Sequence, residues 1–331
     1  MLTIAAPWAR RLAYPALLPA LAAMPWIASD FYLGFATLIL IFSLFAMSLD
    51  LLVGYTGLVS LGHAAFFGIG AYATAILVEL EVVQAVLVLP ASVLLAALAA
   101  AAIGALSVRT AGVSFIMITL ALAQLVYYVA LNSPWTGSTD GMLMSQRPVV
   151  GLPGIDLEDS RQFYFYCLLW VGLSTVLMAR LVRSPFGRAL QGIRANEERM
   201  GAMGFRTVTY KLAVFVIAGA FAGLAGHLFV SLQFFIDPTS LQWSASGQVL
   251  MMVVLGGVGT LAGPAIGALV FHGLEDLISS YTQHWMLPMG LILVLVVLFG
   301  RGGLMGLWRR WQARRSARPP GGPDGGGRDD A

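Results

Sequence analysis

Apolar segments long enough to cross a membrane alternate with short polar segments along most of the chain. A helix needs roughly 20 apolar residues to span a bilayer, and such runs fall at 12–28, 32–53, 58–78, 85–107, 112–131, 163–182, 211–234, 246–260, 264–280 and 285–300. The eighth and ninth runs are short and rich in glycine, so the pattern leaves open whether 246–280 is two spans or one broken span. The pattern predicts an all-α, polytopic membrane domain over residues 12–300.

Charged segments between the apolar runs indicate how many spans there are. Residues 180–211 and the tail from Arg301 are rich in arginine, whereas 133–162 is more acidic than basic. Since basic loops remain on the cytoplasmic side, the first two segments are expected inside and the third outside. Ten spans place every basic cluster inside, whereas nine would leave the arginine-rich tail outside. We therefore expect about ten transmembrane helices with both termini cytoplasmic, the N-terminal one being residues 1–11.

The two ends of the chain carry signals of their own. Arg10 and Arg11 precede the first apolar run, as basic residues do in a cleaved signal peptide. Three prolines interrupt that run, however, and a second span follows at once, which favours a retained span. The tail, 301–331, is basic at first and then rich in Pro and Gly. Such a composition cannot bury a core and predicts disorder.

The composition agrees with a membrane protein and excludes other classes. Of the 331 residues, 59% are hydrophobic and 11% are charged. Soluble proteins carry about 25% charged residues, so this chain cannot cover its surface with polar groups. The net charge of +3 comes from basic residues at the ends of spans, so nucleic-acid binding is not expected. The single cysteine, Cys167, excludes an intramolecular disulfide and a thiolate metal cluster.

No sequence motif for catalysis is found. The chain lacks HExxH, CxxC and GxSxG, and its histidines lie in separate apolar runs or at their ends: His63, His227, His272 and His284. The only lysine, Lys211, lies between Tyr210 and Leu212, so the chain has no Walker A motif for ATP. We expect no metal, no cofactor, no catalytic residues and no enzymatic activity. Any ATP hydrolysis is expected on partner chains.

The stretch 48–77 is apolar but carries five glycines together with Asp50 and His63. Glycine in a helix interior costs about 1 kcal/mol relative to alanine, and ionisable groups at membrane depth cost more, so we expect an interrupted helix. The span count places 54–57 at the cytoplasmic boundary, as a hinge. His63 either bonds to neighbouring backbone at a helix start or faces the pathway.

A second glycine-rich interruption is expected at 256–267, because transporters place broken helices around their pathway. Small residues such as Gly68 and Gly70 are expected instead to allow close helix packing. The candidate hinge and translocation-pathway residues are Gly54, Gly57, Ser60, Gly62, His63, Gly256, Gly257 and Gly259.

The segment 183–211 predicts a short amphipathic helix on the cytoplasmic side. Ser184 and Pro185 have the residue types of an N-cap and a first helical position, and Gly204 has that of a C-cap. Leu190, Ile193, Met200 and Met203 fall near one helical face. Such a helix either lies at the lipid interface or docks into a soluble partner.

Four separated motifs resemble one family. Glu197 precedes Gly204 by seven positions, as an acidic residue precedes a glycine in the cytoplasmic coupling segment of ABC-importer permeases. The run RSPFGRALQGIRANEERMGAMGF (183–205) is similar to permease subunits of branched-chain amino acid importers, as are GYTGLVSLGHAAFFGIGAY (54–72) and LGGVGTLAGPAIGA (255–268). Residues 109–124 and 136–141 resemble the LivM type more than the LivH type. The resemblance covers about 30–300, but Met200 and Gly201 stand where the family often has alanines.

The resemblance implies a multi-pass permease subunit in the inner membrane of a bacterium. Its implied partners are a second homologous permease subunit, two cytoplasmic ATP-binding subunits and an extracytoplasmic substrate-binding protein. Coupling would run through 183–210, with Arg188, Arg194, Glu197, Glu198 and Gly204 as candidate ATPase-coupling residues. Ten spans would divide into a 5+5 inverted repeat, which only a loose likeness of 54–70 to 256–267 supports.

Three other functions remain open. A permease for urea or short-chain amides shares these motifs. A stand-alone, ion-coupled secondary carrier would need charged residues deep in its spans, and the clear candidates are Asp50, Glu275 and Asp276. A structural membrane scaffold is the third alternative, but it gives the interrupted helices no use.

Overall fold

The computed structural model describes residues 21–26, 28–151, 154, 156–282, 284–299 and 302–306. Its long helices are α2 (Asp30–Thr56), α3 (His63–Glu79), α4 (Ala85–Ser107), α5 (Val113–Asn132), α6 (Ser160–Arg183), α9 (Thr207–Gln233), α10 (Trp243–Gly256), α11 (Ala262–Ser279) and α12 (Met286–Phe299). The shorter elements are α7 (Pro185–Ala195), α8 (Glu197–Ala202), the 3-10 turns η1 (Pro134–Thr136), η2 (Ser138–Asp140) and η3 (Pro238–Leu241), and the strands β1 (Met142–Leu143) and β2 (Phe235–Ile236). The predicted all-α class is therefore confirmed for the described residues, apart from one two-residue strand pair.

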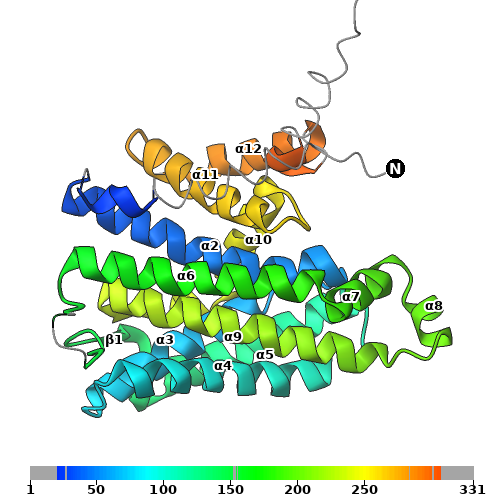
Figure 1. Ribbon diagram of the computed structural model, residues 1–331, viewed down its shortest axis with the longest axis horizontal. Coiled ribbons are helices and arrows are strands. Elements are labelled where there is room, and N and C mark those ends of the chain that lie inside the picture. The colour runs from blue at the N-terminus through cyan, green and yellow to red at the C-terminus, as the bar shows by residue number, and fades with distance from the viewer. Residues whose placement is uncertain are drawn as a thin grey trace, which may run out of the picture.

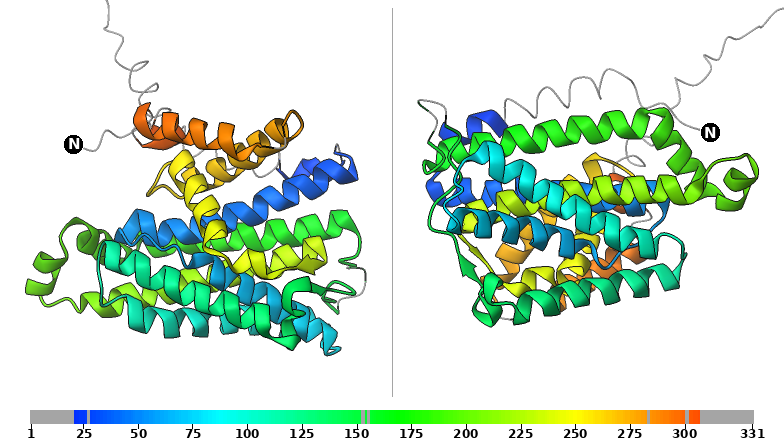
Figure 2. Two further views of the ribbon diagram at one scale, coloured as in Figure 1. Left: turned by 180° about the vertical axis from the view of Figure 1, so that it is seen from behind. Right: turned by 90° about the horizontal axis from the view of Figure 1, so that it is seen from below.

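Helices α2 and α9 form the centre of the bundle (Figures 1 and 2). Within their most apolar windows, 78% of α2 and 67% of α9 are buried, against 28% for α4 and 22% for α5 and α6. The outer helices expose large side chains such as Leu98, Leu125 and Leu169. Because these exposed faces are apolar, they suit lipid rather than water.

Within the described residues, five helices are long and apolar enough to cross a membrane: α2, α4, α5, α6 and α9. Helices α3 and α10 are apolar but shorter; the 14 residues of α10 extend only about 21 Å, less than the hydrocarbon thickness of a bilayer. The first expected span, 12–28, lies largely outside the described residues. The count of ten therefore remains a prediction.

In the first glycine-rich stretch the predicted interruption is present with one boundary corrected, and in the second the structure answers whether 246–280 is one helix or two. The expected span 58–78 begins five residues later, at His63, because Gly57 ends α2 in a left-handed conformation (φ +77°). The chain from 57 to 62 is then non-helical although Leu58, Ser60 and Gly62 are buried. The expected spans 246–260 and 264–280 are two separate helices, α10 and α11, whose backbones meet where Gly256 packs against Gly263.

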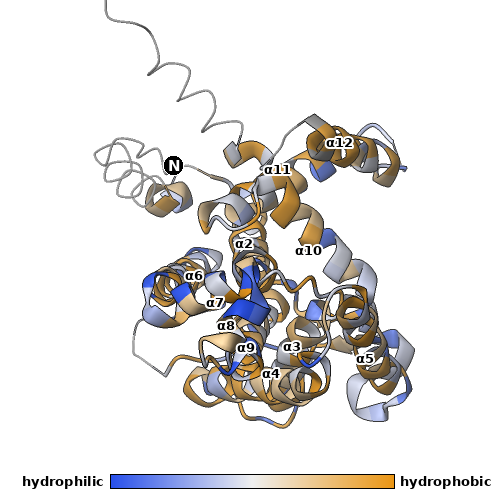
Figure 3. Cartoon of the chain, turned by 90° about the vertical axis from the view of Figure 1, so that its right-hand side faces the viewer, coloured by the Kyte–Doolittle hydropathy of each residue, from blue (hydrophilic) through white to orange (hydrophobic). Residues whose placement is uncertain are grey.

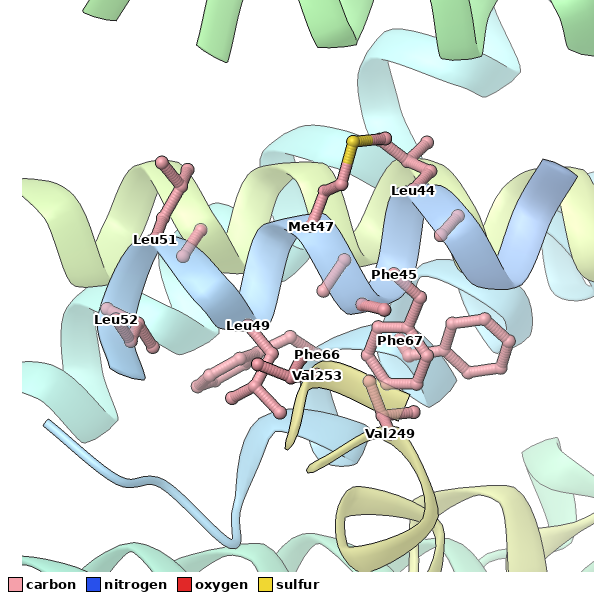
Figure 4. Packing of buried hydrophobic residues seen from close by; sticks show 14 of the residues in the cluster. Leu44, Phe45, Met47, Leu49, Leu51, Leu52, Phe66, Phe67, Val249 and Val253 are labelled. Carbon is pink, nitrogen blue, oxygen red and sulfur yellow. The ribbon is translucent and has the colours of Figure 1, made fainter. Parts of the chain in front are cut away.

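The helices approach closely where small residues face each other. A side chain at Gly70 of α3 would collide with the backbone of Gly223 of α9, and one at Gly226 would collide with the carbonyl of Phe67. This agrees with the expectation that Gly70 permits close packing. Figure 4 shows the neighbouring part of the core, where Phe45 of α2 and Phe67 of α3 lie together above Val249 of α10.

The connecting segments gather at two opposite ends of the bundle. Strand β1 pairs with β2 at one end, and α7 and α8 lie at the other (Figure 1). Segments expected outside, 133–162 and 235–245, meet at the β1–β2 end. Segments expected inside, 54–57 and 261–263, lie at the α7 end.

Arg147 fixes the long loop at the β1–β2 end. Its guanidinium donates to the carbonyls of Ser231 (2.8 Å) and Leu157 (2.7 Å), and it packs over the rings of Phe163 and Phe234 at 4.3 and 4.8 Å. Burial lowers the pKa of Arg147 from its ordinary value. The side chain thus ties the loop to the end of α9.

Candidate functional site

Two short helices form the predicted coupling segment. As expected, Ser184 is the N-cap of α7, its Oγ accepting from the backbone N–H of Gly187 at 3.3 Å, and Gly204 adopts a left-handed φ of +89° beyond the end of α8. The segment is nevertheless not one helix. It breaks at Asn196, whose Oδ1 accepts from the N–H of Arg199 at 2.8 Å and caps a second helix.

This helix pair packs against the first turns of α9. Leu190, Ile193 and Met200 are buried, as the periodicity predicted. Met203 was expected on the same face but is 59% exposed, because the chain leaves the helix there. The ring of Phe186 stacks on Tyr210 of α9, with centroids 5.5 Å apart.

An ion pair fixes α8 to α9. Glu197 Oε2 lies 2.5 Å from Lys211 Nζ, and the Lys211 side chain is only 5% exposed. Glu197 is therefore bound within the chain, and its negative charge compensates a buried ammonium group.

The other coupling candidates lie on the outer surface of the helix pair. Arg188, Glu198 and Gly204 are exposed, and Phe205 next to them is 39% exposed. Figure 3 looks at this end of the molecule and shows hydrophilic residues around α7 and α8. The surface thus combines charges of both signs with two exposed apolar side chains, Met203 and Phe205.

Arg194 connects the helix pair to both glycine-rich turns. Its Nη1 donates to the carbonyl of Gly54 near the end of α2. The guanidinium also borders Gly259 of the α10–α11 turn, and the methylene part of the side chain borders Gly57, each 3.3 Å from where a Cβ would stand. We call Asp50, Gly54, Arg194 and Gly259 the coupling junction.

Asp50 completes the coupling junction from α2. Its Oδ1 accepts from the backbone N–H of Gly259 at 2.8 Å, and its side chain is fully buried. A Cβ at Gly54 would collide with the Asp50 carboxylate and lie 2.6 Å from Gly259 N. The turn between α10 and α11 can therefore approach α2 this closely only because residue 54 is glycine.

The remaining hinge candidates lie beside the junction or deeper in the bundle. Gly256 and Gly257 lie in the same turn, and Gly257 has a φ of +122°. Ser60 accepts from Gly62 N–H at 3.2 Å within the non-helical segment, and Gly62 packs against the carbonyl of Thr119.

His63 was expected to bond to neighbouring backbone or to face the pathway, but it contacts a side chain of α2 instead. Its Nε2 lies 2.8 Å from Ser48 Oγ of α2, and its ring stacks on Phe45. The histidine is fully buried. It therefore joins the start of α3 to α2.

The sequence did not identify several of these contacts. Asp50 was identified only as an ionisable group within an apolar stretch, and the capping role of Asn196 was missed although two acidic residues follow it, a pattern typical of a helix start. Ser246 was also missed; its Oγ accepts from Ala64 N–H at 2.8 Å and joins α10 to α3.

No group of three His, Cys, Asp or Glu side chains in the described part of the chain is placed to hold a metal ion. The arrangement of these contacts can transmit a displacement from one element to another. The helix pair α7–α8 is linked by one arginine to the turns of two helical hairpins, α2–α3 and α10–α11.

Comparison with known proteins identifies relatives over nearly the whole chain. Residues 31–300 match the family described as "Branched-chain amino acid transport system / permease component". The chain is 31% identical to the high-affinity branched-chain amino acid transport system permease protein LivM of Escherichia coli, over 89% of this chain and 74% of LivM. It is 23% identical to the permease protein LivH of Salmonella typhimurium, over 80% of this chain and 91% of LivH. It is 30% identical to the ribose import permease protein RbsC of Bacillus subtilis, over 38% of this chain and 42% of RbsC. No solved structure matches the chain.

Proposed function

Because the chain belongs to the family of branched-chain amino acid transport permeases, we propose that it is the membrane-spanning subunit of an ATP-driven importer for branched-chain or related amino acids. The family places it among multi-pass membrane permeases of ABC systems. Coupling to separate ATPase subunits would run through 183–204. The observation that carries the proposal is the coupling junction, in which Arg194 contacts both glycine-rich turns.

The exposed surface of α7 and α8 is suited to docking a soluble protein. It lies at the end of the molecule where the positive-inside rule places the cytoplasm. Met203 and Phe205 are exposed there among charged residues, and apolar side chains within a polar rim are typical of protein interfaces. This supports docking to an ATPase over burial at the lipid surface.

The packing gives a route from the docked ATPase to the membrane. Glu197 and Lys211 tie α8 to α9, while Arg194 ties α7 to the turns of α2–α3 and α10–α11. A displacement of the helix pair would therefore act on α9 and on both turns at once. Glycine at 54, 57 and 259 lets the turns reorient, as the rocking of helices in alternating access requires.

The remaining partners are proposed by analogy with the family. A second permease subunit, LivH-like, would pair with this chain, two ATP-binding subunits would dock on the cytoplasmic side, and a substrate-binding protein would dock at the β1–β2 end. A urea or short-chain amide permease is the second candidate. The lone-carrier alternative would depend on Asp50, Glu275 and Asp276; Asp50 Oδ1 accepts from Gly259 N–H and Glu275 pairs with His272, and Asp276 is exposed.

Uptake of radiolabelled leucine by cells that express the complete transport system tests the proposal. Arg194→Ala and Gly204→Asp should reduce uptake at least about tenfold while the protein remains in the membrane at wild-type level. Arg161→Ala, an exposed arginine at the opposite end, is the matched control and should leave uptake unchanged. Wild-type uptake by both coupling variants would contradict the docking role. Ion-driven uptake by this chain alone in proteoliposomes would support the carrier instead.

A further inference from the structure

A cavity of about 220 Å³ lies between α2, α3, α9 and α10, and its walls differ in chemistry. One wall consists of phenylalanine rings, and the other carries hydroxyl and amide groups from η3 and the start of α10. Its lining residues are Phe42, Phe45, Phe67, Phe229, Thr239, Ser240, Ser244, Ala245 and Gln248. Thr239 and Ser244 are exposed, so the cavity opens beside η3, toward the β1–β2 end.

The aromatic wall is continuous. The rings of Phe45 and Phe67 stack with centroids 4.5 Å apart, side by side in Figure 4. Phe229 lies 5.2 Å from Phe67 and 5.9 Å from Phe42. Each of the four rings contacts at least two of the others, and together they offer a broad apolar surface, which suits an aliphatic side chain.

The polar wall offers hydrogen-bond acceptors at Thr239 and Ser240 and a hydrogen-bond donor at Gln248. Asp237 Oδ1 accepts from Thr239 Oγ1 at 2.6 Å and from Ser240 Oγ at 3.2 Å. The hydroxyl protons are thus in use and the oxygen lone pairs can accept from a ligand. Gln248 makes no side-chain hydrogen bond among the described residues, so its amide is free to donate to a carboxylate.

We infer that this cavity receives the transported amino acid on its way into the membrane. The aliphatic side chain packs against the four phenylalanines, the ammonium group donates to Thr239 and Ser240 with the Asp237 carboxylate behind them, and the carboxylate accepts from Gln248. No charged side chain lines the cavity, which fits a ligand whose own charges cancel. A urea molecule would leave the aromatic wall uncovered. This inference rests on the proposed function and names its substrate contacts.

Cysteine labelling tests occupancy of the cavity. The single native cysteine of this chain, Cys167, is buried, so labelling of the isolated band of this subunit by a membrane-impermeant maleimide reports Ser244→Cys within the complete importer. Saturating leucine should slow that labelling by about fivefold or more, as expected for a mostly occupied site. Ser280→Cys, an exposed position at the end of α11, is the matched control and should label at the same rate with and without leucine.

A second pair of variants tests the walls. Phe229→Ala should raise the leucine concentration that half-protects Ser244→Cys from labelling roughly tenfold, and should change the half-protecting concentration of free alanine little. Asp237→Asn should raise the half-protecting concentration of both amino acids. If wild-type protein takes up leucine but leucine protects Ser244→Cys no better than Ser280→Cys, the cavity is not the site. Protection by urea or ribose and not by leucine would also overturn the inference. If the wild-type importer takes up no leucine at all, the proposed function itself fails.

Discussion

At the scale of single residues, a few polar contacts hold the α7–α8 end of the bundle together. Asp50 and Arg194 each reach a backbone group of a glycine-rich turn, and Glu197 neutralises the buried Lys211. Removing one partner of such a contact leaves a buried charge or polar group without compensation, which costs more than the contact contributes. These residues should therefore respond strongly to charge reversal and weakly to conservative change.

Reversal of the charge at position 197 tests the ion pair. Glu197→Lys places two ammonium groups together, so α8 should detach from α9 and leucine uptake should fall at least about tenfold. The double variant Glu197→Lys with Lys211→Glu restores opposite charges and should recover a large part of the uptake. If the double variant is as inactive as Glu197→Lys, the glutamate acts through a partner protein and not through Lys211.

Gly54 tests the tight approach of the two turns. Gly54→Ala adds a methyl group where Asp50 and Gly259 leave no space, so we expect a loss of about 1–3 kcal/mol from overpacking and reduced uptake. Gly34→Ala is the matched control in the same helix, because nothing lies within 4 Å of its added Cβ. Thermal stability in detergent and leucine uptake measure the two effects. Equal stability of the two variants would show that the turns can separate without cost.

At the scale of elements, α8 is a short helix whose existence depends on its ends. It has six residues, too few to be stable by propensity alone. Asn196 caps its start, two glutamates occupy the first turn, and Gly204 turns the chain at its end. The helix therefore needs both caps and the packing of Met200 on α7 and Tyr210.

Substitution of the cap tests this dependence. Asn196→Ala removes the acceptor for Arg199 N–H and should cost about 1 kcal/mol of local stability, whereas Asn196→Asp keeps an acceptor and should be neutral. Limited proteolysis of inside-out vesicles reports the difference as faster cleavage within 196–204 for the alanine variant. Identical cleavage of the two variants would mean that packing alone holds α8.

At the scale of the whole molecule, sequence periodicity predicted the long helices well because lipid-facing runs are set by bilayer thickness. The run 85–107 coincides with α4, and 112–131 differs from α5 by one residue at each end. What could not be predicted depends on contacts between distant residues. Asp50 and Gly259 are 209 positions apart, and a single sequence shows no pattern that pairs them. The glycines of 48–77 did predict the interruption after Gly57, but not its extent to Gly62, since Leu58, Val59 and Leu61 are as apolar as the residues of a span.

The span count remains a prediction of the charge pattern, and labelling of the first span can decide it. If 12–28 crosses the membrane, Ser29→Cys faces outward and reacts with an impermeant maleimide in cells whose periplasm is accessible, while Thr3→Cys reacts only after the membrane is permeabilised. Arg199→Cys of α8 should behave like Thr3→Cys, since both are expected inside. With Ser29→Cys outward and Arg199→Cys inward, outward labelling of Thr3→Cys would remove one span from the count. The 5+5 division would then fail, because an odd number of spans cannot form two equal halves.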